Sequence, residues 1–322
     1  MIEIFHVKRS GEKVNISNLR IKMSISSSLS EVARTLDLTL YCKEYREVFL
    51  GEIIEFNGIE YHIFKKDMDS EGEQMNLTCF DKLIYLKKNQ ASYNFKNQTP
   101  EGITNKICSE FNIKVNHIES TGVTINRKFR NVDLYGIIQT AYTMASEKTG
   151  KKYYMTYNNG LTIKEAFVEN GVELKEGLNI IKVSHSEDLQ NMINAVIVYN
   201  ENQEKVQEIK NDSWISLYGK LSLSFEKNKD GEQEDYKSNL KDIEKTLNAE
   251  CVGDLSLTTG KCVHITEKDT NIKGLFYIKS DTHTFENSTH TTSLELSFEK
   301  IMDEQSSGEE ESKENNKIQS KK

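Results

Sequence analysis

The sequence predicts an α+β fold in which β-strands dominate, and three observations support this class. Apolar and polar residues alternate repeatedly toward both ends of the chain, which is the period of a strand with one buried face. Two stretches near the middle carry helix start and stop signals together with apolar residues one turn apart. The chain has 322 residues, enough for two or three domains of ordinary size.

Residues 1–92 form the first predicted domain, and almost all of it has the pattern of strands. Leu36, Leu38 and Leu40 alternate with polar residues and fall on one face. Asn57-Gly58 lies between two strand-like runs and is a strong hairpin signal, because both residue types accept the positive φ angles of a tight turn.

Residues 93–188 are predicted to be a compact α/β insert. Thr99-Pro100-Glu101 is a helix start, with Thr as the N-cap and Pro at the first helical position. A second helix is expected to begin at Asp133 and to end near Thr149-Gly150, where glycine is a suitable C-cap.

Residues 189–301 are predicted to form a second β domain, a small antiparallel barrel or sandwich. Leu294, Leu296 and Phe298 alternate with polar residues near its end. One helix is expected between Asp235 and Glu250, where apolar residues recur at helical spacing. The stripe consists of Tyr236, Leu240, Ile243 and Leu247.

Residues 302–322 are predicted to be a disordered tail. From Asp303 onward there is no aromatic residue, and Ile318 is the one large apolar residue among Glu, Ser, Asn and Lys. Such a segment buries too little apolar surface to offset the entropy of ordering it.

Composition excludes several classes of function. The net charge is −8, which argues against a protein that grips nucleic acid, because that task usually requires a basic face. No run of about eighteen apolar residues is present, and the first residues lack the pattern of a signal peptide. We therefore expect that the protein does not associate with a membrane and that it is made in the bacterial cytoplasm. The five cysteines are scattered and are interpreted as reduced thiols.

An enzyme site would have to lie in the α/β insert, but no catalytic motif is found there. Its carboxylates could in principle act as an acid–base pair. The candidates are Glu101, Glu110, Glu119, Asp133, Glu147 and Glu165. No Gly-x-Ser-x-Gly motif accompanies them. We expect no catalytic, cofactor-binding or metal-binding residues, the pair His283 and His290 included, and no enzymatic activity.

The order of segments resembles that of late-control-D-type (XkdQ-like) baseplate hub proteins of contractile phage tails and phage-tail-like bacteriocins. The resemblance rests on an N-A-V-I-V-Y strand, a Y-G-K-L strand, a helix, the run G-D-L…T-G-K-C-V and the closing L-E-L-S-F strand. The first of these begins at Asn194 and the last ends at Phe298. The N-terminal run from Ser24 to Leu40 is similar to the first barrel of that family.

The resemblance implies two tail-tube-like antiparallel barrels per chain and a structural role. In such hubs three chains form a pseudo-sixfold ring that joins the hexameric tail tube to the trimeric central spike. The implied partners are two further copies of the chain, the tail tube protein, the spike and other baseplate proteins. DNA passes through the lumen without specific binding, and the particle is released by lysis.

We predict that two strands supply the interfaces between chains. The unpaired backbone amide and carbonyl groups of an edge strand can form hydrogen bonds with a strand of a neighbouring subunit. The predicted interface residues are Leu36, Leu38, Leu40, Leu294, Leu296 and Phe298. Two other classes of function stay open: a peptidoglycan hydrolase with its site in the insert, and a cell-wall-binding module.

Overall fold

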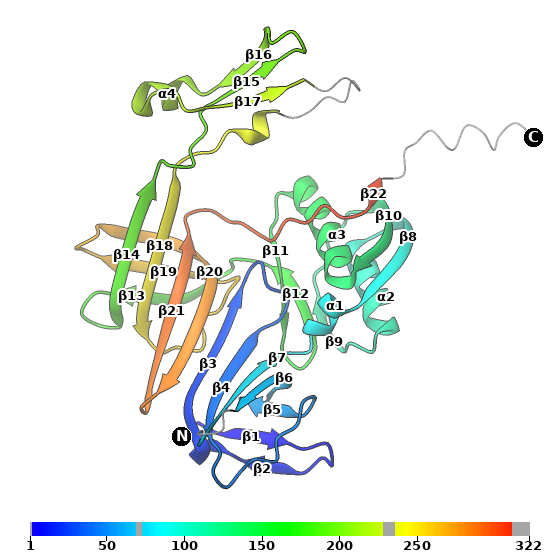
Figure 1. Ribbon diagram of the computed structural model, residues 1–322, viewed down its shortest axis with the longest axis vertical. Helices are drawn as coiled ribbons and strands as arrows, with labels where there is room; N and C mark the ends of the chain where they lie inside the picture. Colours follow the sequence, from blue (N-terminus) through cyan, green and yellow to red (C-terminus); the bar gives the residue numbers. More distant parts are fainter. Residues whose placement is uncertain (1, 69–72, 228–235, 311–322) are drawn as a thin grey trace, which may run out of the picture. The chain divides into compact units, whose positions relative to one another are not determined.

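The computed structural model describes residues 2–68, 73–227 and 236–310, and strands dominate it (Figure 1). The chain divides into two compact units. The first unit comprises Met1–Val183 together with Asn248–Lys322, and the second comprises Ser184–Leu247. The predicted α+β class with a predominance of strands is confirmed.

The N-terminal part of the first unit is an antiparallel sheet in the order β3-β4-β7-β6-β5-β1-β2. Its strands are β1 (Ile4–Val7), β2 (Lys13–Asn15), β3 (Arg20–Ser28), β4 (Thr35–Tyr41), β5 (Ile53–Phe56), β6 (Ile59–Met68) and β7 (Gln74–Phe80). Alternation along β4 buries every second side chain, as predicted, and Leu38 lies opposite Leu77 of β7. Asn57 and Gly58 have φ angles of 51° and 74°, so the predicted hairpin between β5 and β6 is also confirmed.

An α/β part follows. It contains α1 (Ile84–Lys88), β8 (Gln90–Gln98), α2 (Pro100–Glu110), β9 (Val115–Ile118), β10 (Ile125–Asp133), α3 (Leu134–Thr149), β11 (Tyr153–Tyr157) and β12 (Leu161–Glu165). The predicted caps are confirmed: Thr99 accepts a hydrogen bond from the Gly102 amide, and Asp133 accepts one from the Gly136 amide. Gly150 ends α3 with a φ of 71°.

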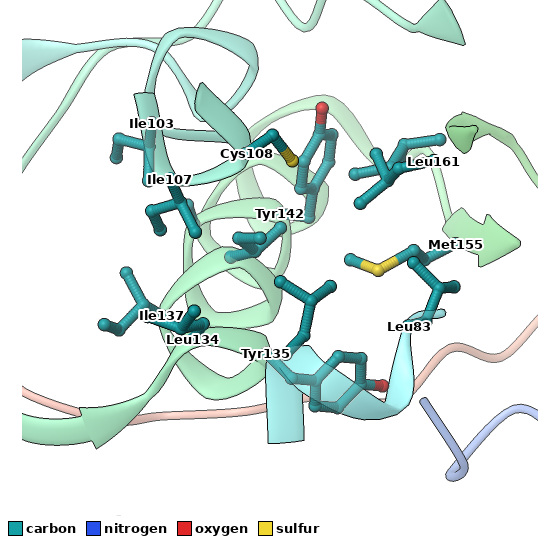
Figure 2. Close-up of a cluster of buried hydrophobic side chains, with 14 of the residues drawn as sticks. Leu83, Ile103, Ile107, Cys108, Leu134, Tyr135, Ile137, Tyr142, Met155 and Leu161 are labelled. Atoms are coloured by element: carbon teal, nitrogen blue, oxygen red, sulfur yellow. The ribbon is translucent and has the colours of Figure 1, made fainter. Parts of the chain in front are cut away.

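The core of this α/β part lies between its helices and strands. Figure 2 shows Ile103 and Ile107 of α2 near Ile137 of α3, while Met155 and Leu161 come from β11 and β12. These side chains are at most 6% exposed. The apolar sides of the two predicted helices therefore meet each other and a small sheet, which fixes their relative position.

The remaining strands of the first unit come from both sides of the second unit in sequence, and two of them, β14 and β18, continue across the boundary into the second unit. They are β13 (Glu169–Lys175), β14 (Ile180–Asp188), β18 (Glu244–Val252), β19 (Cys262–Glu267), β20 (Ile272–Glu286), β21 (Thr289–Ser297) and β22 (Glu309–Glu310). The order is β14-β18-β21-β20, and β19 joins β13 to β20. The chain leaves the first unit along β14 and returns along β18.

One long strand joins the two halves of the first unit. The 15-residue β20 pairs along one edge with β19 through its first half and with β3 through its second half. The strands of both halves consequently belong to one 13-stranded sheet, which is open across the described residues. This corrects the expectation of two closed barrels. The two halves of the first unit share one sheet, and neither half closes into a barrel of its own.

The helix predicted between Asp235 and Glu250 is wrong. From Glu244 onward the stretch is β18, and the part around Tyr236–Asn239 is a single 3₁₀ turn. Leu247, Ala249 and Cys251 are buried in alternation, which is the period of a strand. β18 gains hydrogen bonds from a strand on each side, and this pairing outweighs the helical spacing of the four apolar residues.

The second unit is small. It holds β15 (Ala195–Tyr199), β16 (Lys205–Lys210), α4 (Asp212–Tyr218) and β17 (Ser222–Glu226), and β15 is the central strand. The expected strand at Tyr218-Gly219-Lys220-Leu221 is wrong, because α4 ends there and Gly219 adopts a φ of 77°. The buried Asn194 holds the turn: its side chain donates to the Gly219 carbonyl and accepts from the Leu221 amide.

The predicted disordered tail is wrong for residues 302–310, while residues 311–322 lie outside the described part. Met302 is 8% exposed and belongs to the core of the α/β part. Tyr135 donates a hydrogen bond of 2.7 Å to Asp303, and the Arg127 guanidinium donates to the Ser307 carbonyl. Backbone pairing of β22 with β10 completes the contact.

A glycine makes this close approach possible. Gly308 has a φ of 76°, and a Cβ at this position would lie 2.6 Å from the Lys128 carbonyl oxygen. Any larger residue would separate the segment from β10. Amide hydrogen bonds from Gln305 and Ser307 to Thr143 and Thr140 of α3 add to the attachment.

A charged cluster joins segments that are distant in the sequence. Arg34 forms an ion pair with Asp281 of β20, whose side chain is fully buried. Asp281 also accepts a hydrogen bond of 2.6 Å from the Thr259 amide. The Arg34 amide donates to Asp81, and burial raises the pKa of that carboxyl to about 7. The cluster thus connects the N-terminal strands, the α/β part and β20.

The C-terminal segment yields a stability prediction. A chain that ends after Glu310 should melt at the temperature of the full chain. A chain that ends after Ile301 should melt about 5–10 °C lower, because it loses the buried Met302 and several hydrogen bonds. Differential scanning fluorimetry of both proteins checks this, and equal melting temperatures would refute the structural role of residues 302–310.

The buried ion pair yields a second prediction. Arg34→Met leaves the Asp281 carboxylate without its cation and should lower the free energy of unfolding by about 3–5 kcal/mol. Adding Asp281→Asn should restore most of this loss. Lys22→Met breaks an exposed pair with Glu286 and should cost less than about 1 kcal/mol. Urea unfolding followed by circular dichroism compares the variants, and similar losses in both single variants would contradict the assignment.

Candidate functional site

The residues predicted for the interface are mostly buried within the chain. Leu36, Leu38 and Leu40 are at most 1% exposed and belong to the N-terminal core. Their strand β4 has β3 on one side and β7 on the other, so its hydrogen-bonding edges are occupied. An interface at this strand would have to use the opposite face, where Tyr41 is 38% exposed.

The second predicted strand has a similar position. Leu294 and Leu296 of β21 are at most 3% exposed, and β21 lies between β20 and β18. Phe298, just after the strand, is 38% exposed and contacts the ring of Phe276 edge-on, with 5.5 Å between ring centroids. The structure brings Leu36, Leu38 and Leu40 together in one core, and it leaves Phe298 as the one partly exposed member of the predicted set.

A different exposed apolar surface lies at β14, a strand that falls within the predicted α/β insert. Leu178, Ile181 and Val252 are 74%, 54% and 56% exposed. The Val252 amide donates to the Asn179 carbonyl at 2.8 Å, so Val252 lies next to the start of β14. We call these three residues the edge patch. Large exposed apolar side chains gathered in this way often mark an interaction surface.

The edge patch borders an open sheet edge. Across the described residues, β14 has a hydrogen-bonded neighbour on one side only, β18. An unpaired strand presents amide and carbonyl groups to another chain. A signal for this surface was present in the sequence, since Ile180-Ile181-Lys182-Val183 has the composition of a strand with apolar residues on both faces.

The carboxylates of the α/β part are held by ordinary structural contacts. Asp133 caps α3, and Glu165 forms an ion pair of 2.8 Å with Lys151. Burial acts to raise the pKa of Glu101, but hydrogen bonds from its own amide and from Thr121 and Ser120 outweigh burial and lower it.

The pKa of Glu110 is lowered as well, by hydrogen bonds from Lys106 and Tyr93. Glu119 lies 3.4 Å from His117. A carboxyl group that acts as a general acid near neutral pH needs a raised pKa, and Glu101 and Glu110 shift the opposite way. This geometry does not favour an acid–base pair in the insert.

Other candidate chemistry is equally sparse. All five cysteines are buried thiols, and burial raises the pKa of Cys108 to about 12, which disfavours a reactive thiolate. His283 and His290 contact each other through ring nitrogens 3.3 Å apart, and burial lowers the pKa of His283 to about 4. Within residues 2–68, 73–227 and 236–310, no helix is long and apolar enough to cross a membrane.

Comparison with known proteins supplies the family. The YQBQ-like family matches residues 23–297. The phage-like element PBSX protein XkdQ of Bacillus subtilis (strain 168) is 26% identical over 94% of this chain and 99% of its own length.

Solved structures show the same fold. The 43 kDa tail protein of prophage MuSo2 from Shewanella oneidensis matches with a TM-score of 0.68 and 13% identity, over 92% of this chain and 98% of that one. The E. coli c3393 protein, described as a component of the type VI secretion system with structural similarity to the T4 bacteriophage tail proteins gp27 and gp5, matches with a TM-score of 0.53 and 10% identity. That match covers 91% of this chain and 76% of the c3393 chain. The resemblance to XkdQ-like proteins is confirmed, and the chain belongs to the YQBQ-like family.

Proposed function

We propose that this chain is a structural subunit of a phage-type tail baseplate and acts there as the hub. The similarity to the PBSX protein XkdQ along almost the whole of both chains carries this proposal. The shared fold with a prophage tail protein supports it. The chain is made in the bacterial cytoplasm and leaves the cell by lysis as part of a phage or bacteriocin particle.

Three copies form a ring between the hexameric tail tube and the central spike. The chain carries two sets of antiparallel strands that β20 joins in one sheet. Three such chains present six comparable sets of strands, which suits contact with a sixfold tube on one face and a threefold spike on the other. The excess of acidic residues, with a net charge of −8, lets DNA pass through the ring without binding.

The edge patch is one surface through which neighbouring chains meet. Pairing at the β14 edge satisfies open backbone groups, and contact with Leu178, Ile181 and Val252 removes exposed apolar surface from water. The strand β4 contributes to assembly through its outward side, where Tyr41 is partly exposed, and the end of β21 contributes through the partly exposed Phe298 that follows it.

The proposed interface can be tested by placing negatively charged side chains in it. Ile181→Asp combined with Val252→Asp places two carboxylates on the edge patch and should abolish trimer formation, because a buried unpaired charge is costly. Met68→Asp is the control, since Met68 is 40% exposed on the distant strand β6. Light scattering after size-exclusion chromatography measures the mass. A double variant that forms trimers like the control would remove the edge patch from the proposal.

The role in the particle is tested by deleting the gene from a producing strain. Tails should be absent or lack a baseplate in electron micrographs of the lysate, and the intact gene should restore them. A gene in which Glu101, Glu110, Glu119 and Glu165 become Gln should also restore assembly, because each of these carboxylates is placed by local contacts. Normal tails in the deletion strain would refute the hub role.

A further inference from the structure

We propose that a cavity of about 590 Å³ in the first unit, lined mainly by polar residues, binds a small anion rich in hydroxyl groups, a carboxylated or phosphorylated sugar. The cavity lies between the strand face of β9, β11 and β12 and the turn Thr258–Lys261 that precedes β19. Its volume falls within the range of about 300–1,000 Å³ typical of small-molecule sites. This binding site is independent of the proposed role in the baseplate.

The floor of the cavity is the polar face of the small sheet. Thr156 of β11 lies opposite Thr162 of β12, and Tyr154 lies opposite Lys164. These four residues line the cavity. The alternate residues of β12, Leu161 and Ile163, point the other way into the core of the α/β part. One face of this sheet is therefore used for packing, and the other is lined with hydroxyl and amino groups.

An unsatisfied hydroxyl group marks the floor as a binding surface. Thr162 is 6% exposed, and its Oγ1 atom has no hydrogen-bond partner among the described residues. A buried hydroxyl group without a partner costs about 1–3 kcal/mol. The Oγ1 atom itself is enclosed, so a ligand that carries a hydroxyl or carboxylate group can supply the missing hydrogen bond if Thr162, which lines the cavity, changes its χ1 rotamer.

The charges around the cavity favour an anion. The two acidic residues of the lining have cationic or titratable neighbours: Glu165 pairs with Lys151, and Glu169 lies 3.7 Å from His264. Lys164 forms no ion pair with any residue in the described ranges. Lys261 is half-buried and donates only to the neutral Ser256 carbonyl at 2.9 Å. Within the described ranges neither of these two ammonium groups is in an ion pair, and the carboxylate of Asp254 acts on Lys261 only from beyond ion-pair distance.

Burial and the nearby Arg34 lower the pKa of Lys261, and the carboxylate of Asp254 raises it by less than these two effects lower it. Arg34 itself is engaged with Asp281. A carboxylate or phosphate in the cavity would offset both influences on Lys261. The side chains of Asn116 and Asn158, which also line the cavity, offer amide groups that suit the hydroxyl groups of a sugar.

The cavity wall is formed before any ligand arrives. Gly260 has a φ of 82°, and a Cβ there would lie 2.3 Å from the Tyr154 ring, so the turn rests directly on this ring. The Gly260 amide donates to the Ile278 carbonyl, and the Gly260 carbonyl accepts from the Phe167 amide at 2.6 Å. A preformed site avoids the entropic cost of ordering a loop on binding.

Titration calorimetry on the full chain tests the proposal, with N-acetylmuramic acid, glucose 6-phosphate, inorganic phosphate and glucose as probes. We expect saturable binding of at least one of the two anionic sugars and no saturation by glucose up to about 10 mM. Tighter binding of N-acetylmuramic acid would identify the ligand as a carboxylated sugar. Tighter binding of glucose 6-phosphate would identify it as a phosphorylated sugar. Inorganic phosphate should bind more weakly than the preferred sugar, because it cannot reach the hydroxyl and amide groups together.

Variants locate the site. Lys261→Met and Lys164→Met should each weaken binding by about tenfold, and Thr162→Val should weaken it less while raising thermal stability of the free protein. Lys182→Met is the matched control, an exposed lysine on β14 outside the cavity, and should bind like the unaltered chain. Failure of both anionic sugars to saturate, equal binding of glucose, or equal losses in Lys182→Met and Lys261→Met would overturn the proposal.

Discussion

The pairing of β3 with β20 is the constraint on which the first unit depends. Residues 22–28 and 280–286 form one continuous ladder, although almost the whole chain lies between them in sequence. The buried pair of Arg34 and Asp281 lies at the end of this ladder and fixes its register, because a shift by one residue would turn Asp281 to the other face of the sheet. Closing so long a loop is entropically costly and slow, so the two halves depend on each other to fold.

Local signals explain what the sequence could predict. The leucines of β4, the Asn57-Gly58 turn and the caps at Thr99 and Asp133 each act within a few residues, and each appears in the structure as expected. Propensity and pattern suffice where no distant partner competes.

Distant partners explain the errors. The stripe from Tyr236 to Leu247 fits a helix, yet Leu247 belongs to a strand because β21 and β14 provide hydrogen bonds on both sides. The segment after Met302 has the composition of a disordered chain, but Arg127 and Tyr135 supply partners that no local pattern reveals. The polar cavity was missed for the same reason, since Thr162 and Lys261 meet only in the folded chain.

The second unit enters and leaves the sheet through β14 and β18, which are neighbouring, hydrogen-bonded strands. Its two points of attachment are therefore close together. A short hairpin turn at this place would connect β14 to β18 equally well. Natural selection can then lengthen, replace or remove this module while the strands that carry it keep their pairing. Related particles could in this way acquire different surface modules on one conserved framework.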